Sequence, residues 1–248
     1  MKKTAWKNFT EARDRFKSLT EDLSRNYPGL QAAQQKLVDS RGGPAYPVET
    51  PVVYNNALDD IRPETNISLI LVADNPGRRE QAAENRRYLV GPSGKIAEKF
   101  FREHPGLEIN FRQNVIIINK TPIHTPRTVE LWELCRPGTQ ADFSAAIVSS
   151  QQTMAEILLD LHRCLAPIPV WITGYSEMKK GGIFEAYTEA LKKLYKRQRA
   201  RREEVFLFRH FSMNQFTIDL NQQKKPAEPL ETALKRIGAA YRMRILGW

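Results

Sequence analysis

Polar side chains suited to hydrolytic chemistry follow three separate apolar runs of this chain. They are Asp74, Asn75, Asn119 and His210. Together a carboxylate, two amides and an imidazole can orient a water molecule, pair with an amide-bearing ring and stabilise a departing anion. Each residue alone is typical of an ordinary turn after a strand, so a site is indicated only if the fold brings the four together.

The elements that position these residues follow from the hydrophobic pattern. Apolar runs predict strands at Ser68–Asp74, Asn114–Asn119, Val170–Thr173 and Val205–Phe208. Amphipathic spacing predicts helices between and after them, at about 93–104, 129–135, 143–165, 183–204 and 230–243. Alternating strands and helices indicate an α/β domain with a mostly parallel sheet. Parallel strands end at one edge, so we expect the four polar residues to converge there.

A Pro-Gly turn follows the first pair of polar residues. Pro76 fixes one backbone dihedral, and Gly77 allows backbone to approach a ligand closely. A second glycine-bearing segment, VGPSG at 90–94, opens the next predicted helix. The alternative for this stretch is an ordinary turn between a strand and a helix.

Four short segments carry a family resemblance, in order along the chain. They are ADNPG at 73–77, RYLVGPSG at 87–94, INKTPI at 118–123 and HFSMN at 210–214. This series resembles the uracil-DNA glycosylase superfamily, with features of its single-strand-selective and iron–sulfur branches. The resemblance implies a three-layer α/β/α sandwich around a four-stranded sheet. It also implies a base-excision repair enzyme that hydrolyses the N-glycosidic bond of uracil, or of a related deaminated or damaged base, in DNA.

The resemblance also implies roles for the polar residues. The target nucleotide is flipped out of the stack, and Asn75 positions the attacking water. Asp74 is the alternative, as a water-activating carboxylate. Asn119 pairs with the polar edge of uracil, because an amide both donates and accepts. His210 donates a hydrogen bond to the departing base.

Other residues acquire expected roles from the same motifs. The expected walls of the base pocket are Ala73, Gly77, Tyr88, Leu89 and Gly91, and the expected wedge in the duplex is Met213 with Asn214. The chain departs from the family at several positions. Leu89 stands where the family has a stacking Phe, so either Tyr88 beside it takes over the stacking or base stacking is weaker. Ala73 replaces a glycine, and Phe211 and Met213 replace prolines. The four cluster cysteines are missing, so we expect no metal and no cofactor.

Charge points to a polyanionic partner. The net charge is +10, and cations crowd residues 192–202. We expect DNA-phosphate contacts from Lys196, Arg197, Arg199, Arg201 and Arg202, although a solvated helix end is the alternative. No apolar run approaches the roughly 20 residues that span a bilayer, and the first residues lack the apolar core of a signal peptide. We therefore expect no membrane partner and a cytoplasmic location.

The expected organisation is one globular unit. Residues 1–66 form an N-terminal helical extension and connector packed on the core, and residues 67–248 form the glycosylase-like domain. Two alternatives to a glycosylase stay open: a nucleic-acid-binding protein of the same fold without catalysis, and an unrelated small-molecule α/β hydrolase. The sequence contains no Gly-x-Ser-x-Gly elbow, P-loop or dinucleotide fingerprint.

Overall fold

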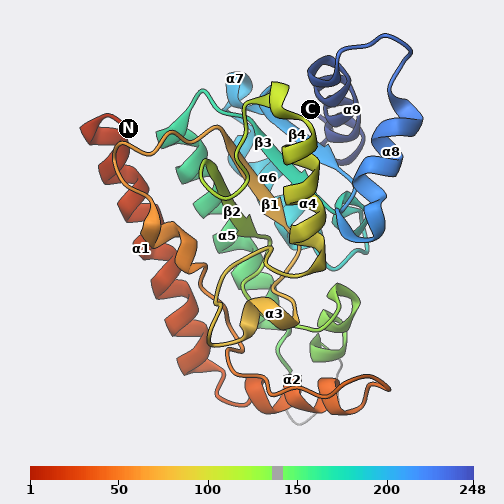
Figure 1. The fold of residues 1–248 in the computed structure, drawn as a ribbon. Coiled ribbons are helices and arrows are strands. Elements are labelled where there is room, and N and C mark those ends of the chain that lie inside the picture. Colours follow the sequence, from red (N-terminus) through yellow and green to blue (C-terminus); the bar gives the residue numbers. More distant parts are fainter. Residues whose placement is uncertain (136–141) are drawn as a thin grey trace.

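Four short apolar segments form the central sheet of this computed structural model, which describes residues 1–135 and 142–248. The strands are β1 Leu69–Ala73, β2 Val115–Asn119, β3 Val170–Thr173 and β4 Val205–Phe208. Runs of aliphatic and aromatic residues without alternation are typical of strands buried on both faces. Every pairing is parallel, and the strand order is β2-β1-β3-β4 (Figure 1). The predicted parallel sheet is confirmed.

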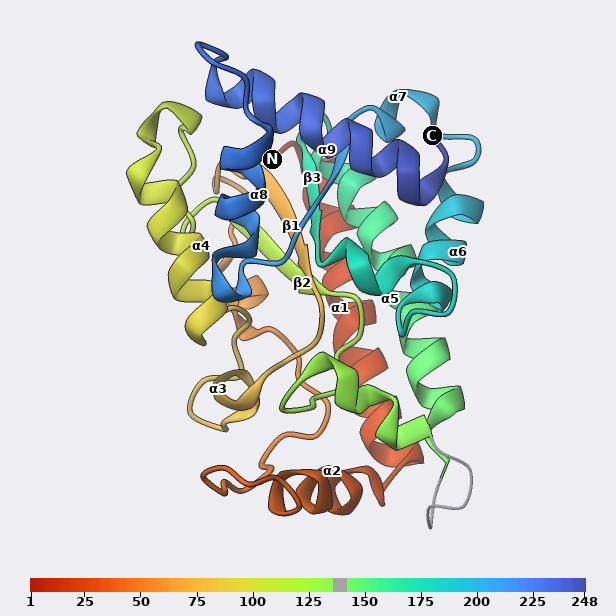
Figure 2. The ribbon, with the colours of Figure 1, turned by 90° about the vertical axis from the view of Figure 1, so that its right-hand side faces the viewer.

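Helices cover both faces of this sheet. Their bounds are α1 Lys3–Asn26, α2 Leu30–Asp39, α3 Arg78–Gln81, α4 Pro92–Glu103, α5 Ser144–Leu165, α6 Glu185–Tyr195, α7 Arg199–Arg202, α8 Gln215–Gln223 and α9 Leu230–Leu246. Figure 2 shows α4 and α8 on one side of the sheet and α5 and α6 on the other. On the first side, the ring of Phe216 lies 4.9 Å from that of Phe100 and 5.9 Å from that of Trp171. The predicted α/β/α sandwich is confirmed.

The N-terminal segment shares the hydrophobic core of the sheet domain. Helix α1 packs along α5, and its Phe9 and Phe16 side chains are fully buried. Arg15 of α1 forms ion pairs with Glu156 and Asp160 of α5. Residues 1–66 are therefore joined to the core by both apolar and charged contacts.

The C-terminal helix lies against the edge strand β4. Gly238 of α9 makes this approach possible, because a Cβ atom there would lie 2.6 Å from the Cβ of Phe206. Within the described parts of the chain, no helix is both long and apolar enough to cross a membrane.

Two expected helical regions differ in the structure, and one helix of the structure was not predicted. Residues 129–135 form two 3₁₀ turns, Thr128–Leu131 and Glu133–Cys135, in place of a helix. The predicted basic helix at 183–204 is broken after Tyr195 and resumes as the single turn α7. Helix α8, Gln215–Gln223, lies beyond the fourth strand, where we predicted no helix. Its Phe216 packs on Trp171 of the sheet, so tertiary packing stabilises a helix that the local pattern does not indicate.

Candidate active site

A cavity of about 900 Å³ opens at the carboxyl ends of β1, β3 and β4. Asp74 and Asn75 reach it from the end of β1, and His210 reaches it from the end of β4. The start of α4 and the loop at 125–128 complete the wall. The fold therefore brings three of the four predicted chemical residues together. Ala73, Gly77, Leu89 and Gly91 also line this cavity, as expected for pocket walls.

Asp74 is held by a lysine that sequence reasoning did not identify as part of the site. The Lys120 ammonium lies 2.5 Å from Asp74 Oδ1 and donates to the Thr173 carbonyl, also at 2.5 Å. It also lies 4.8 Å from the ring centroid of Phe184. Burial lowers the pKa of Lys120, and the Asp74 carboxylate opposes that shift. The lysine links the ends of β2, β1 and β3, and it leaves Asp74 Oδ2 without a donor among the described residues.

The end of β3 is shaped to fit the same carboxylate. Gly174 has a φ of +75°, in the left-handed region that residues other than glycine rarely adopt. In addition, a Cβ atom at this position would lie 2.3 Å from Asp74 Oδ1. Any larger residue would therefore displace Asp74.

The amide of Asn75 has a defined orientation. Its Nδ2 donates to Thr125 Oγ1 at 2.8 Å, and its Oδ1 accepts from Thr128 Oγ1 at 2.9 Å. The Thr125 hydroxyl donates its own proton to the Arg127 carbonyl, so it must act as acceptor toward Asn75. An amide oxygen has two lone pairs, so Oδ1 can still accept a hydrogen bond from water.

The imidazole of His210 presents a free donor. The backbone N–H of Ser212 donates to Nδ1 at 3.0 Å, and Ser212 Oγ lies 2.8 Å from the same nitrogen. Because Nδ1 accepts this hydrogen bond, the neutral ring carries its own proton on Nε2. No partner for Nε2 is present among residues 1–135 and 142–248. Burial lowers the pKa of His210, with Asp74 opposing the shift and Lys120 adding to it, so the neutral form is favoured.

Asn119 does not line the cavity. Its side chain is buried at the end of β2, with 1% of the residue exposed. Neither its Oδ1 nor its Nδ2 has a hydrogen-bond partner among the described residues. A buried unpaired amide carries a desolvation cost. Its expected role in reading a base stays a prediction.

Tyr88 is also placed away from the cavity. Its hydroxyl donates to the Val53 carbonyl at 2.6 Å inside the core, and 1% of the residue is exposed. Leu89 lines the cavity instead, with a φ of +53°. Gly94 allows this bend, because a Cβ atom there would lie 1.5 Å from the Leu89 carbonyl oxygen. Stacking by Tyr88 is therefore not supported in this arrangement.

The predicted wedge residues lie on a 3₁₀ turn next to His210. Met213 and Asn214 have φ values of 50° and 56°, in the left-handed region. Met213 is 78% exposed. Asn214 is exposed as well. Phe211, in contrast, is fully buried, and its ring stacks on Phe216 at 4.4 Å. The buried Phe211 ring therefore anchors the turn, and the turn exposes the apolar Met213 side chain to solvent.

Cationic side chains line the cavity from several parts of the chain. They are Arg78, Arg79, Arg127, Lys179, Arg209 and Arg244. The carboxylates that line it are Asp74, Glu80 and Glu177, of which Asp74 is paired with Lys120. This excess of positive charge suits a ligand that carries phosphate groups. Arg78 and Arg79 directly follow the Pro-Gly turn, a signal that the sequence already offers.

The cations predicted from the sequence lie elsewhere. Lys196, Arg197, Arg199, Arg201 and Arg202 immediately precede β4, whereas the cavity lies at the opposite, carboxyl end of that strand. In Figure 1, α7 lies at the top of the molecule, and α3, which borders the cavity turn, lies low. The structure does not bring this group to the cavity.

Glu80 is a further cavity residue that the sequence pattern did not reveal. Its Oε2 accepts a hydrogen bond from the backbone N–H of Gly77 at 2.8 Å. Burial raises the pKa of Glu80 to about 7, while backbone hydrogen bonds from Gly77 and Leu89 oppose the shift. Glu80 therefore positions two stretches of the cavity wall through their backbone.

Within the described parts of the chain, no group of three His, Cys, Asp or Glu side chains could hold a metal ion. Cys135 and Cys164 are free, and burial raises the pKa of both thiols, to about 12 for Cys164. These are properties of unreactive thiols.

No protein-family model matches the chain, and no curated protein matches its sequence.

Proposed function

We propose that this protein is a DNA glycosylase that hydrolyses the N-glycosidic bond of uracil or a related base. The observation that carries the proposal is the convergence of Asp74, Asn75 and His210 on one cavity, each with a free hydrogen-bonding atom. The six cations that line the cavity support a substrate with phosphate groups. The exposed Met213 beside His210 supports insertion into a nucleic-acid stack.

The reaction assigns a role to each atom. Asn75 Oδ1 accepts a hydrogen bond from the attacking water, and the free Oδ2 of Asp74 takes the water proton. The water oxygen bonds to C1′ of the sugar while the bond from C1′ to the base nitrogen breaks. The electron pair of that bond leaves with the base as an anion. The Nε2–H of His210 stabilises this anion without transferring its proton.

The test is base excision on labelled single- and double-stranded oligonucleotides that carry uracil, hypoxanthine or xanthine. Asn75→Ala and His210→Ala should each lower the excision rate about 100- to 1000-fold. Binding of undamaged DNA should stay within about twofold of the unmodified protein, because the cationic residues are retained. Asn221→Ala and His104→Ala are matched controls outside the cavity and should keep full activity. Full activity in the Asn75 and His210 variants would overturn the assignment.

One observation favours a second candidate, a nucleic-acid-binding protein of the same fold without catalysis. Asn119, expected to read the base, is buried away from the cavity, as is Tyr88, which was expected to line the base pocket. DNA binding without excision of any of the three bases would support this candidate. Excision of any one of them that is lost in Asn75→Ala would exclude it.

A further inference from the structure

The break in the basic helix creates a separate cationic surface. Helix α6 ends at Tyr195, and the chain turns through residues 196–198 before α7. Arg202 holds this turn in place: its Nε donates to the Tyr195 carbonyl at 2.7 Å, and its Nη2 donates to the Lys196 carbonyl. Arg201 Nη1 donates to Gln198 Oε1 at 2.9 Å. These two arginines therefore stabilise the turn rather than face a ligand.

The other cations on this turn and on the adjoining ends of α6 and α7 are exposed to solvent. They are Lys193, Lys196, Arg197 and Arg199, all exposed. No carboxylate of the described residues forms an ion pair with any of them. Lys192, by comparison, is paired with Glu189 at 2.9 Å. Four unpaired cations within seven positions, held by a fixed backbone turn, form what we call the α6–α7 surface.

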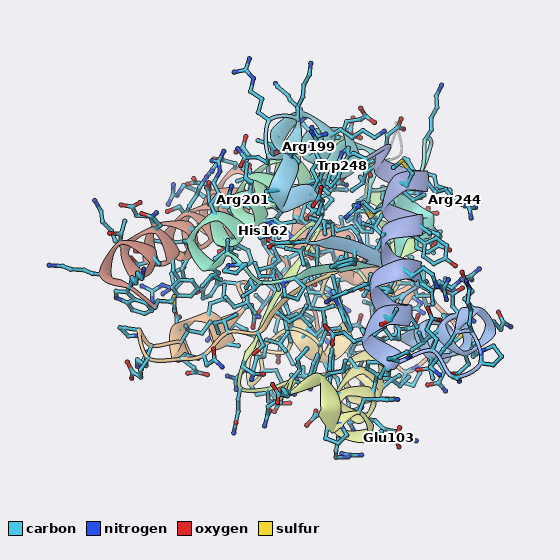
Figure 3. The ribbon with its side chains drawn as sticks, turned by 90° about the horizontal axis from the view of Figure 1, so that it is seen from above. Glu103, His162, Arg199, Arg201, Arg244 and Trp248 are labelled. Atoms are coloured by element: carbon cyan, nitrogen blue, oxygen red, sulfur yellow. The ribbon has the colours of Figure 1, made fainter. Side chains whose placement is uncertain are left out.

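This surface is distinct from the cavity. It lies at the amino end of β4, and the cavity lies at the carboxyl end. Viewed from above in Figure 3, Arg199 lies near Arg201 and Trp248, well apart from Arg244 on α9, which lines the cavity. A nucleotide seated in the cavity therefore does not neutralise the α6–α7 surface.

We infer that the α6–α7 surface is a second binding site for the phosphate backbone of nucleic acid, independent of base identity. Its free groups are all cations, which recognise phosphates without reading sequence. An anionic membrane is a poorer fit, because interfacial binding also needs apolar side chains. The exposed large apolar residues of the described chain all lie outside positions 192–202. This site engages long nucleic acid while the cavity takes one nucleotide.

The test uses undamaged DNA, so it does not depend on excision. Four substitutions to Gln, at Lys193, Lys196, Arg197 and Arg199, are compared with four at the exposed positions Lys2, Lys3, Arg102 and Lys225. Both variants lose the same charge. Binding of a labelled 30-nucleotide strand and a 30-base-pair duplex is followed by fluorescence anisotropy as salt is varied.

The surface variant should bind about 10- to 100-fold more weakly at 0.1 M salt, with a duplex salt slope smaller by about 3. The matched variant should stay within about threefold of the unmodified protein. Equal losses in the two variants, or no loss in the surface variant, would overturn the inference. Loss of binding to phosphatidylserine vesicles with DNA binding retained would assign the surface to a membrane and also overturn it. If the glycosylase proposal fails, this result is unaffected, because no reaction is measured.

Discussion

Lys120 and Asp74, 46 positions apart in the chain, form an ion pair of 2.5 Å beneath the cavity floor. The lysine is completely buried, and 12% of the Asp74 side chain is exposed. The aspartate thus meets both the protein interior and the cavity. The attraction within a buried ion pair adds little to the stability of the folded protein. Removing one partner costs much more, because it leaves the other charge buried without a partner.

Lys120→Met should therefore lower the free energy of unfolding by about 3–5 kcal/mol, because Asp74 is left as a buried charge without its partner. Asp74→Asn in the same chain should recover most of that loss. Urea denaturation of the two single variants and the double variant gives the coupling energy. Losses that simply add would show that the two groups do not interact in solution.

Thr128→Val should lower excision about 10- to 100-fold, because Asn75 Oδ1 loses the hydroxyl that holds its amide in place. The unfolding free energy should fall by only about 1 kcal/mol. Thr128→Ser keeps the hydroxyl and is the matched control. Single-turnover rates measure the effect, and an unchanged rate in Thr128→Val would show that Asn75 does not depend on this contact.

His210 should remain a neutral donor at pH values below the ordinary histidine pKa of about 6.5, because burial lowers the pKa of His210. The excision rate should therefore show no loss attributable to His210 as the pH falls from 8 to about 6.5. The comparison with His210→Gln over this range isolates the contribution of the imidazole. A histidine-dependent loss centred above pH 6.5 would contradict a neutral, desolvated ring.

His124 should make stability depend on pH. It is fully buried, its Nδ1 donates to the Pro76 carbonyl at 2.8 Å, and Tyr46 Oη lies 3.2 Å from its Nε2. Burial lowers the pKa of His124 from 6.5 to about 4, so the unfolded chain takes up a proton more readily between these values. The contribution of His124 to the unfolding free energy is therefore fully present above about pH 6.5. It is lost as the pH falls toward 4, by about 3 kcal/mol in total.

The measurement is the difference in unfolding free energy between the unmodified protein and His124→Gln, at pH 7 and at pH 4.5. Subtraction removes the opposite contribution of Glu80, whose raised pKa makes stability fall as the pH rises from about 4.5 to 7. The difference should shrink as the pH falls. A difference that is the same at both pH values would show that His124 is not neutral and buried.

The N-terminal segment should also stabilise the turn at Pro76 and Gly77, which borders the cavity. Gln34 of α2 donates to the carbonyls of Pro51 and His124, at 2.9 and 2.8 Å. Gln34→Leu should lower the unfolding free energy by about 1–3 kcal/mol, because the His124 carbonyl loses its donor and the Pro51 carbonyl keeps only the backbone N–H of His124. It should also weaken excision, because His124 holds the Pro76 carbonyl. The exposed Gln222→Leu is a control, and an unaffected excision rate would limit Gln34 to a role in stability.

The sequence by itself determined the strands of the sheet and the sheet edge at which the candidate catalytic residues lie. Val170–Thr173 and Val205–Phe208 form strands at their predicted bounds. Short apolar runs bounded by polar turns are typical of strands that are buried in the core. Parallel order follows from the alternation with helices, and it places Asp74, Asn75 and His210 at one edge.

Only the tertiary structure decided which side chains face the cavity. Local periodicity contains no information about Lys120 reaching Asp74 and Thr173, or about the Tyr88 hydroxyl reaching Val53. The same holds for Asn119, whose strand was predicted but whose amide is enclosed in the core. These outcomes depend on contacts between segments distant in the chain, where packing and the satisfaction of buried polar groups outweigh local preference.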